Sequence, residues 1–207
     1  MYKLVETQPN TSNYKLMNAG INENVSLVDV TFDTLRQDGT GGNVIRFYFQ
    51  DDEGAKFTQT YMEVTSLDRL KESAKNAASS GRPWSSTPEQ LHKDLLRNVG
   101  ESLFHILCAF VPKEKAMLQG ATWDELGKNV IDLVGNSYEG LKFKIKCVYD
   151  KQGKYLQFPQ RPLQPFILSQ DSDVNLTISS RDNLNAAAPT SEAEITKESS
   201  GSEGDLW

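Results

Sequence analysis

Lysines and tyrosines in the C-terminal third of the chain are the residues whose type and spacing best suit a chemical task. Between positions 139 and 161 six basic residues stand against two acids. These basic residues are Lys142, Lys144, Lys146, Lys151, Lys154 and Arg161. Aromatic residues interleave with them and also occupy earlier segments. The tyrosines are the better candidates for a wet groove, because a phenol tolerates water: Tyr48, Tyr61, Tyr149 and Tyr155.

This combination fits the binding of single-stranded nucleic acid, which needs cations for the phosphates and ring faces on which bases stack. The same residues also have a plainer interpretation. Phe47, Phe49 and Phe143 fit a barrel core, which is the favoured interpretation for each aromatic residue taken singly, and the lysines fit an ordinary solvated face of a strand. The sequence leaves both interpretations open.

Catalytic and metal-binding arrangements are not found in the sequence. His92 and His105 fall on one predicted helix and point away from a common face, without liganding partners at suitable offsets. The glycines of 39–42 join two predicted strands, whereas a phosphate-binding loop opens a helix. The acids of 51–53 lie at a hairpin tip, where they would be solvated. We therefore expect no enzyme, no metal and no cofactor. A small nuclease is disfavoured because no acid cluster is placed to hold magnesium.

The elements that must position the basic and aromatic residues follow from hydrophobic periodicity. Alternation predicts strands over 24–32, 44–49, 56–61, 141–149 and 154–158, with a weaker run at 174–178. In the first strand it places Val28, Val30 and Phe32 on one face. Helical spacing predicts helices over 66–78, 88–110 and 122–134. Thr87 and Thr122 are the expected N-caps of the second and third helices.

The order of these elements predicts a mainly β fold with a helical insertion, which is an α+β class. Three strands, a helical insert at about 65–135 and two further strands match the connectivity of a five-stranded oligonucleotide-binding (OB-like) barrel. A two-layer α+β sheet with helices on one face fits the same order and is the alternative, but we expect the barrel.

Composition divides the chain into a body, 1–180, and a disordered acidic tail, 181–207. The net charge of −6 is unevenly spread, because the tail holds six acids against two bases. Its few large apolar residues cannot offset the entropy cost of ordering it. No apolar run is long enough to span a bilayer, and the N-terminus lacks a signal-peptide core. With only two cysteines in addition, we expect a cytoplasmic protein with no membrane contact.

The tail ends in Asp205, Leu206 and Trp207, a tip suited to docking. A terminal tryptophan in a solvated tail has nothing nearby to bury it. It could instead fill an apolar pocket of a partner while the carboxylates meet basic residues. An accidental aromatic at a disordered end is the alternative.

The strand that opens at 20–25, the order of strands and helices, and the acidic aromatic-ended tail resemble the single-stranded DNA-binding proteins of bacteriophages. The resemblance covers about 20–65, 138–168 and 200–207 and leaves the helical insert unaccounted for. It implies a body that binds single strands without sequence preference. It also implies a tip, here Asp205, Leu206 and Trp207, that recruits replication and recombination enzymes and competes with DNA for the basic groove. Gly204 and Ser202 stand where that family usually has more carboxylates, so such competition would be weaker here.

We therefore expect sequence-nonspecific binding of single-stranded DNA in phage replication, recombination and repair, in the host-cell cytoplasm. The main alternative is a non-catalytic phage interaction or assembly protein, with the barrel as scaffold and the acidic tail as docking peptide. The oligomeric state, the site size and the preference for DNA over RNA do not follow from the sequence.

Overall fold

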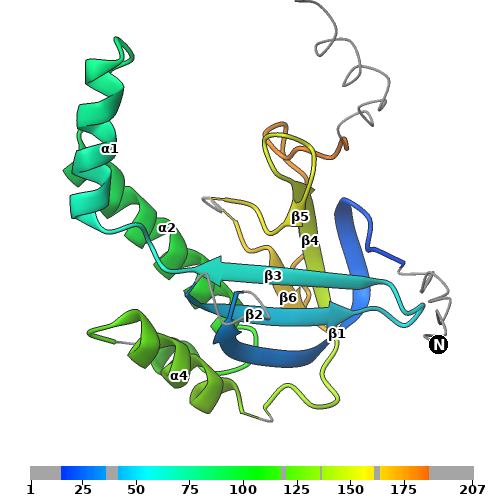
Figure 1. The fold of residues 1–207 in the computed structure, drawn as a ribbon. Coiled ribbons are helices and arrows are strands. Elements are labelled where there is room, and N and C mark those ends of the chain that lie inside the picture. The colour runs from blue at the N-terminus through cyan, green and yellow to red at the C-terminus, as the bar shows by residue number, and fades with distance from the viewer. Residues whose placement is uncertain (1–14, 36–41, 118–119, 136, 161–163, 187–207) are drawn as a thin grey trace, which may run out of the picture.

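An antiparallel sheet with helices inserted between its third and fourth strands forms the body of the protein (Figure 1). The computed structural model describes residues 15–35, 42–117, 120–135, 137–160 and 164–186. The strands are β1 (Gly20–Thr34), β2 (Asn43–Gln50), β3 (Lys56–Met62), β4 (Phe143–Tyr149), β5 (Leu156–Gln157) and β6 (Ile167–Ser169). The helices are α1 (Leu67–Ser79), α2 (Pro88–Leu107), α3 (Lys113–Ala116) and α4 (Trp123–Val134). The α+β class and the helical insert are therefore confirmed.

The strand order is β3-β2-β1-β4-β5, with β6 also paired to β4. The long β1 joins the two halves, because its residues 26–34 pair with β2 and its residues 20–25 pair with β4. In the described chain no backbone ladder connects β3 to β5, so the sheet is open and a closed five-stranded barrel is not confirmed. A side-chain contact links these two edges: the Phe158 backbone N–H donates to Gln59 Oε1 at 2.8 Å.

An irregularity in β1 interrupts the alternation that was predicted for this strand. The register against β2 shifts between Leu27 and Asp29, as a β-bulge does. Because the extra residue reverses the alternation, Leu27 and Val30 are buried whereas Val28 is 52% exposed. The prediction that Val28 lies on the same face of the strand as Val30 and Phe32 is therefore wrong.

The helix starts are set by local hydrogen bonds that the sequence predicts correctly. Thr87 Oγ1 accepts from the Gln90 N–H at 3.2 Å, and Thr122 Oγ1 accepts from the Glu125 N–H at 3.2 Å. The elements missed are short ones: α3, and β6, which pairs with β4 over three residues. The weak run at 174–178 forms no strand.

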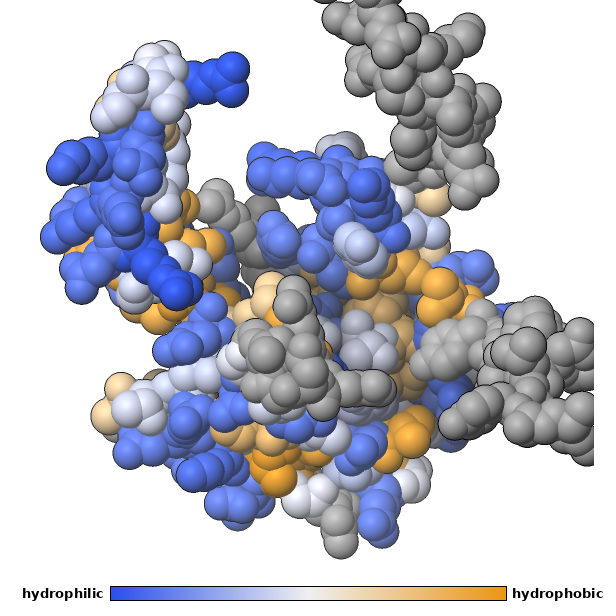
Figure 2. Space-filling view, in the orientation of Figure 1, coloured by the Kyte–Doolittle hydropathy of each residue, from blue (hydrophilic) through white to orange (hydrophobic). Residues whose placement is uncertain are grey.

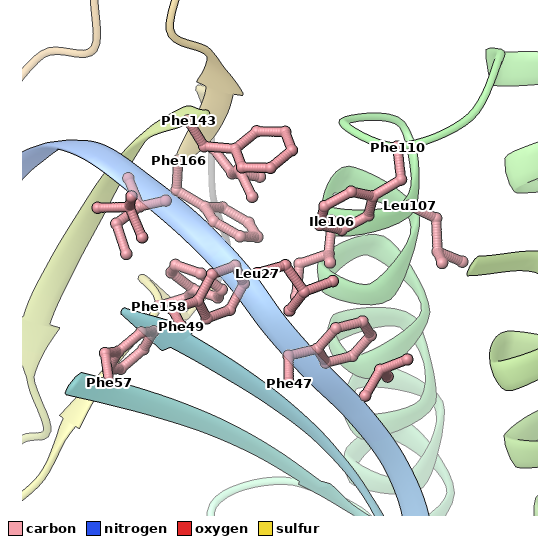
Figure 3. Close-up of a cluster of buried hydrophobic side chains, with 14 of the residues drawn as sticks. Leu27, Phe47, Phe49, Phe57, Ile106, Leu107, Phe110, Phe143, Phe158 and Phe166 are labelled. Atoms are coloured by element: carbon pink, nitrogen blue, oxygen red, sulfur yellow. The ribbon is translucent and has the colours of Figure 1, made fainter. Parts of the chain in front are cut away.

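Aromatic side chains from distant parts of the chain form the core between the sheet and α2 (Figure 3). The Phe158 ring lies 4.5 Å from that of Phe166 and 5.0 Å from that of Phe57, measured between centroids. From α2, the fully buried Ile106 and Leu107 pack into the same cluster. Phe158 immediately follows β5, so this packing holds β5 near β3 even without a backbone ladder.

Gly127 in α4 gives a first testable prediction, because a Cβ there would overlap the Phe32 ring. Alanine normally favours a helix over glycine, yet Gly127→Ala is expected to lower the free energy of unfolding by about 1–3 kcal/mol through overpacking. Gly100 in α2 is the matched control, since a Cβ there meets nothing within 4 Å. Gly100→Ala should raise the free energy of unfolding by about 0.5–1 kcal/mol.

Urea unfolding of both variants measures these opposite signs. Equal stabilisation by the two substitutions would contradict the packing of Phe32 against α4.

Candidate nucleic-acid interface

The lysine-bearing face of β4 is covered by a later segment, residues 170–183, which we call the strap. The strap begins where the Gln170 N–H donates to the Lys142 carbonyl at 2.8 Å. Lys144 Nζ donates to the Ser172 carbonyl at 3.3 Å. At the other end, the Tyr149 N–H donates to the Asn183 carbonyl at 2.7 Å. The strap therefore follows β4 from one end of the strand to the other.

A buried ion pair fastens the strap near its end. Lys146 Nζ lies 3.0 Å from Asp182 Oδ2 and donates to the Thr177 carbonyl at 3.0 Å. The two side chains are only 6% and 9% exposed. Lys146, one of the basic residues expected to contact phosphates, does not lie on an open surface, because the alternation of β4 fixes the face of this residue but not what covers that face. Asp182 and Asn183, which the sequence analysis placed in the tail, contact the body.

The pKa of Asp182 is lowered by this arrangement. Burial by itself raises the pKa of the carboxyl, because it disfavours the charged form. Hydrogen bonds from the Ser179 backbone, together with the hydrogen bond and charge of Lys146, outweigh burial and hold the pKa below its ordinary value. Asp182 is therefore a carboxylate whose charge stabilises the strap.

The β4–β5 hairpin carries cations and an aromatic ring into solvent. Its turn is held by Asp150, whose Oδ1 accepts from the Lys154 N–H at 2.8 Å, and by Gly153 at a φ of 70°. Lys151 and Lys154 are exposed, and in the described chain neither forms an ion pair. Tyr155 is 71% exposed. Figure 2 shows hydrophilic side chains gathered over this hairpin.

A pocket of about 420 Å³ lies between the β4–β5 hairpin and the end of the strap. Figure 1 shows these two segments next to each other, and Asn183 Nδ2 donates to the Asp150 carbonyl at 2.8 Å. The pocket brings together three of the predicted residues: Lys146, Tyr149 and Lys151. It adds residues that the sequence analysis did not select, namely Gln157, Gln160, Gln164, Arg181 and Asn183.

Arg181 is the most consequential of these additions. It is exposed, and it forms no ion pair within the described ranges. The boundary predicted at 180/181 assigns Arg181 to the acidic tail, whereas in the structure it lies beside residues of the body. Because Lys146 and Asp182 neutralise each other, the cations left at the pocket are Lys151 and Arg181.

Other predicted residues lie outside this pocket. Lys142 forms an ion pair with Asp52 at the β2–β3 turn. Tyr48 lies on the outer side of β2, where it lines a second, smaller pocket of about 270 Å³ with Val28 and Thr58. The structure therefore does not gather all predicted cations and rings on one strand face.

Tyr61 belongs to the core. It is 6% exposed, and its Oη lies 2.5 Å from the Ser102 Oγ of α2. Burial raises the pKa of its hydroxyl, so the phenol stays protonated. The prediction of Tyr61 as a base-stacking residue is wrong here, since the ring fills space between β3 and α2. Arg161, Asp205, Leu206 and Trp207 lie outside the described residues.

Within the described ranges, no group of three or more His, Cys, Asp or Glu side chains is placed to hold a metal ion. No helix in that part of the chain is both long and apolar enough to cross a membrane. Comparison with models of protein families, with curated proteins and with solved structures found no match for this chain.

The Asp182–Lys146 pair predicts a pH-dependent contribution to stability. Because the folded-state pKa of Asp182 lies below its ordinary value of 3.8, this contribution is present above that value and is lost as the pH falls through the lowered one. Asp182→Asn should lower the free energy of unfolding by up to about 3–5 kcal/mol near neutral pH, because it leaves Lys146 buried and unpaired. The difference from the unmodified chain should shrink in acid.

Urea unfolding at about pH 6 and about pH 3 tests this, because the lower pH lies below the ordinary pKa of 3.8, where the unfolded chain takes up a proton at Asp182 and part of the stabilisation is lost. Asp173→Asn, an exposed acid of the same strap, is the control and should change little at either pH. A gap between Asp182→Asn and the unmodified chain that is equal at both pH values would contradict the assignment.

Proposed function

We propose that this chain binds single-stranded DNA without sequence preference, as a non-catalytic protein of phage replication, recombination and repair in the host-cell cytoplasm. The observation that carries the proposal is the β4–β5 hairpin, where the highly exposed Tyr155 stands beside Lys151 and Lys154, which form no ion pair with any described residue. A solvated aromatic ring has no packing role there. Next to exposed cations it suits a nucleic-acid strand, since each stacked base contributes about 1–3 kcal/mol.

The cations of this surface are better suited to phosphates than those under the strap. Lys151 and Arg181 line the pocket mouth and Lys154 follows on the hairpin, all exposed. Lys142 and Lys144 already contact Asp52 and the Ser172 carbonyl, so contact with a phosphate would compete with these partners. We therefore assign the main electrostatic role to Lys151, Lys154 and Arg181, with Lys142 and Lys144 at the margin.

We further propose that the sheet acts as an OB-like barrel. The strand order β3-β2-β1-β4-β5 supports it, as do the bridging role of β1 and the Gln59–Phe158 contact between the two edges. In OB-folds, the face of strands 2 and 3 and the connection between strands 4 and 5 bind oligonucleotides. In this chain these positions correspond to the outer side of β2 with Tyr48, and to the β4–β5 hairpin.

The C-terminal tip is assigned to partner enzymes on the sequence alone. Asp205, Leu206 and Trp207 combine an apolar end with carboxylates, which suits a pocket rimmed by basic residues. We propose that they recruit enzymes of replication and recombination.

Charge reversal on the hairpin tests the proposal. Lys151→Glu combined with Lys154→Glu should weaken binding of labelled oligo-dT by about tenfold or more, because two phosphate contacts become repulsive. The matched control is Lys113→Glu combined with Lys115→Glu on α3, an equal charge change on exposed lysines elsewhere. Through net charge alone it should weaken binding by less than about threefold.

Fluorescence anisotropy at one fixed salt concentration measures both pairs. Equal losses in the two would show that only net charge matters, and would remove the hairpin from the binding site.

Removal of the tip separates its role from that of the body. A chain ending at Ser200 should bind oligo-dT as tightly as the whole chain or more tightly, because it loses acids and no proposed DNA contact. Anisotropy titration of the two chains in parallel measures this. Substantially weaker binding by the shortened chain would contradict the assignment of 201–207 to partners.

A further inference from the structure

The pocket between the hairpin and the strap has a charged floor with unused hydrogen-bonding capacity. An ammonium group has three N–H donors. Two of those on Lys146 donate to Asp182 Oδ2 and to the Thr177 carbonyl, and in the described chain the third has no acceptor. Lys146 nevertheless lines the pocket, although its side chain is only 6% exposed. A buried charged donor without an acceptor is costly, so this N–H suits an acceptor of a bound molecule.

The carboxylate beside it can accept further hydrogen bonds. An ionised carboxylate has about four acceptor positions. Asp182 uses them for Lys146 and for the groups of Ser179, the nearest being the Ser179 N–H at 2.7 Å. The floor therefore presents a donor and an acceptor next to each other, which is the pattern on the hydrogen-bonding edge of a nucleobase.

The walls of the pocket combine apolar and polar side chains. Tyr149, Val148 and Pro159 give it an apolar side. Glutamines contribute amide groups, and the Gln157 and Gln160 side chains share only one long hydrogen bond of 3.4 Å. These side chains therefore keep donors and acceptors for a ligand. A few polar groups within an apolar wall, in a volume of about 420 Å³, are typical of a small-molecule site.

The positive charge that is not neutralised lies at the mouth of the pocket and not at its floor. Lys151 and Arg181 line the opening and are exposed, whereas Lys146 and Asp182 below neutralise each other. An anionic group would therefore lie at the mouth and an uncharged polar ring inside. This division of charge matches a nucleotide, which has a phosphate at one end and a base at the other.

We propose that this pocket receives one nucleotide, with its base over Lys146 and Asp182 and its phosphate at Lys151 and Arg181. The inference rests on the proposed function, since in a bound single strand this nucleotide would be one that leaves the stack and enters the pocket. On its Watson–Crick edge each of the four bases offers an acceptor beside a donor, so the pocket is compatible with sequence-tolerant binding.

Nuclear magnetic resonance titration of the full-length, ¹⁵N-labelled chain with each of the four deoxynucleoside 5′-monophosphates tests the pocket. We expect shifts in the backbone amides of Tyr149, Ser179, Arg181 and Asn183. Deoxyribose 5-phosphate, which lacks the base, should bind at least about tenfold more weakly than the deoxynucleoside monophosphates. The stacking and hydrogen bonds of the base account for this difference in affinity. Equal binding of the base-free sugar phosphate would overturn the nucleotide pocket and leave only an anion site at its mouth.

Asp182→Asn should weaken mononucleotide binding, and Asp173→Asn on the same strap should not. Because Asp182→Asn also loosens the strap, the titration of the unmodified chain carries the decision. Absence of shifts at these amides would overturn the pocket.

Oligo-dT binding by the same sample distinguishes the two claims. Binding of oligo-dT without mononucleotide shifts would leave the proposed function standing and remove the pocket. Mononucleotide shifts without oligo-dT binding would keep a nucleotide site and remove the strand-binding function.

Discussion

The buried pair of Lys146 and Asp182 is the interaction on which the candidate site depends. It holds the strap against β4, and the strap in turn forms one wall of the pocket and brings Arg181 to the mouth. A buried ion pair contributes little net stability compared with apolar packing, but loss of one partner leaves an uncompensated charge. The pair therefore determines where the strap lies more than how stable the protein is. The charges left over at this surface are those of Lys151, Lys154 and Arg181.

This arrangement explains how a chain with a net charge of −6 can present a basic surface. Counting charges along the sequence finds a basic stretch, but several of its lysines already have partners in the folded chain. Lys142 meets Asp52 and Lys146 meets Asp182. What a ligand encounters is the remainder after this pairing, concentrated on one hairpin and one pocket mouth.

Features set by contacts within a few residues could be predicted from the sequence. The N-caps Thr87 and Thr122 were correct because each cap bonds to a backbone N–H three residues away. Features set by distant segments could not. The bulge that exposes Val28 depends on the register with β2, and the burial of Lys146 depends on a strap more than thirty residues later. For the same reason the sequence does not show that Tyr61 is buried, because its hydroxyl bonds to Ser102 of the distant helix α2.

The salt dependence of oligo-dT binding by the whole chain tests the central claim most directly. Each phosphate contact to a single strand contributes about −0.7 to the slope of log K against log salt concentration, so contacts from Lys151, Lys154 and Arg181 predict a slope of about −2 or steeper. Anisotropy titrations over a series of salt concentrations measure this slope. A slope near zero, or no binding at low salt, would contradict the account and favour a scaffold that acts through its tail.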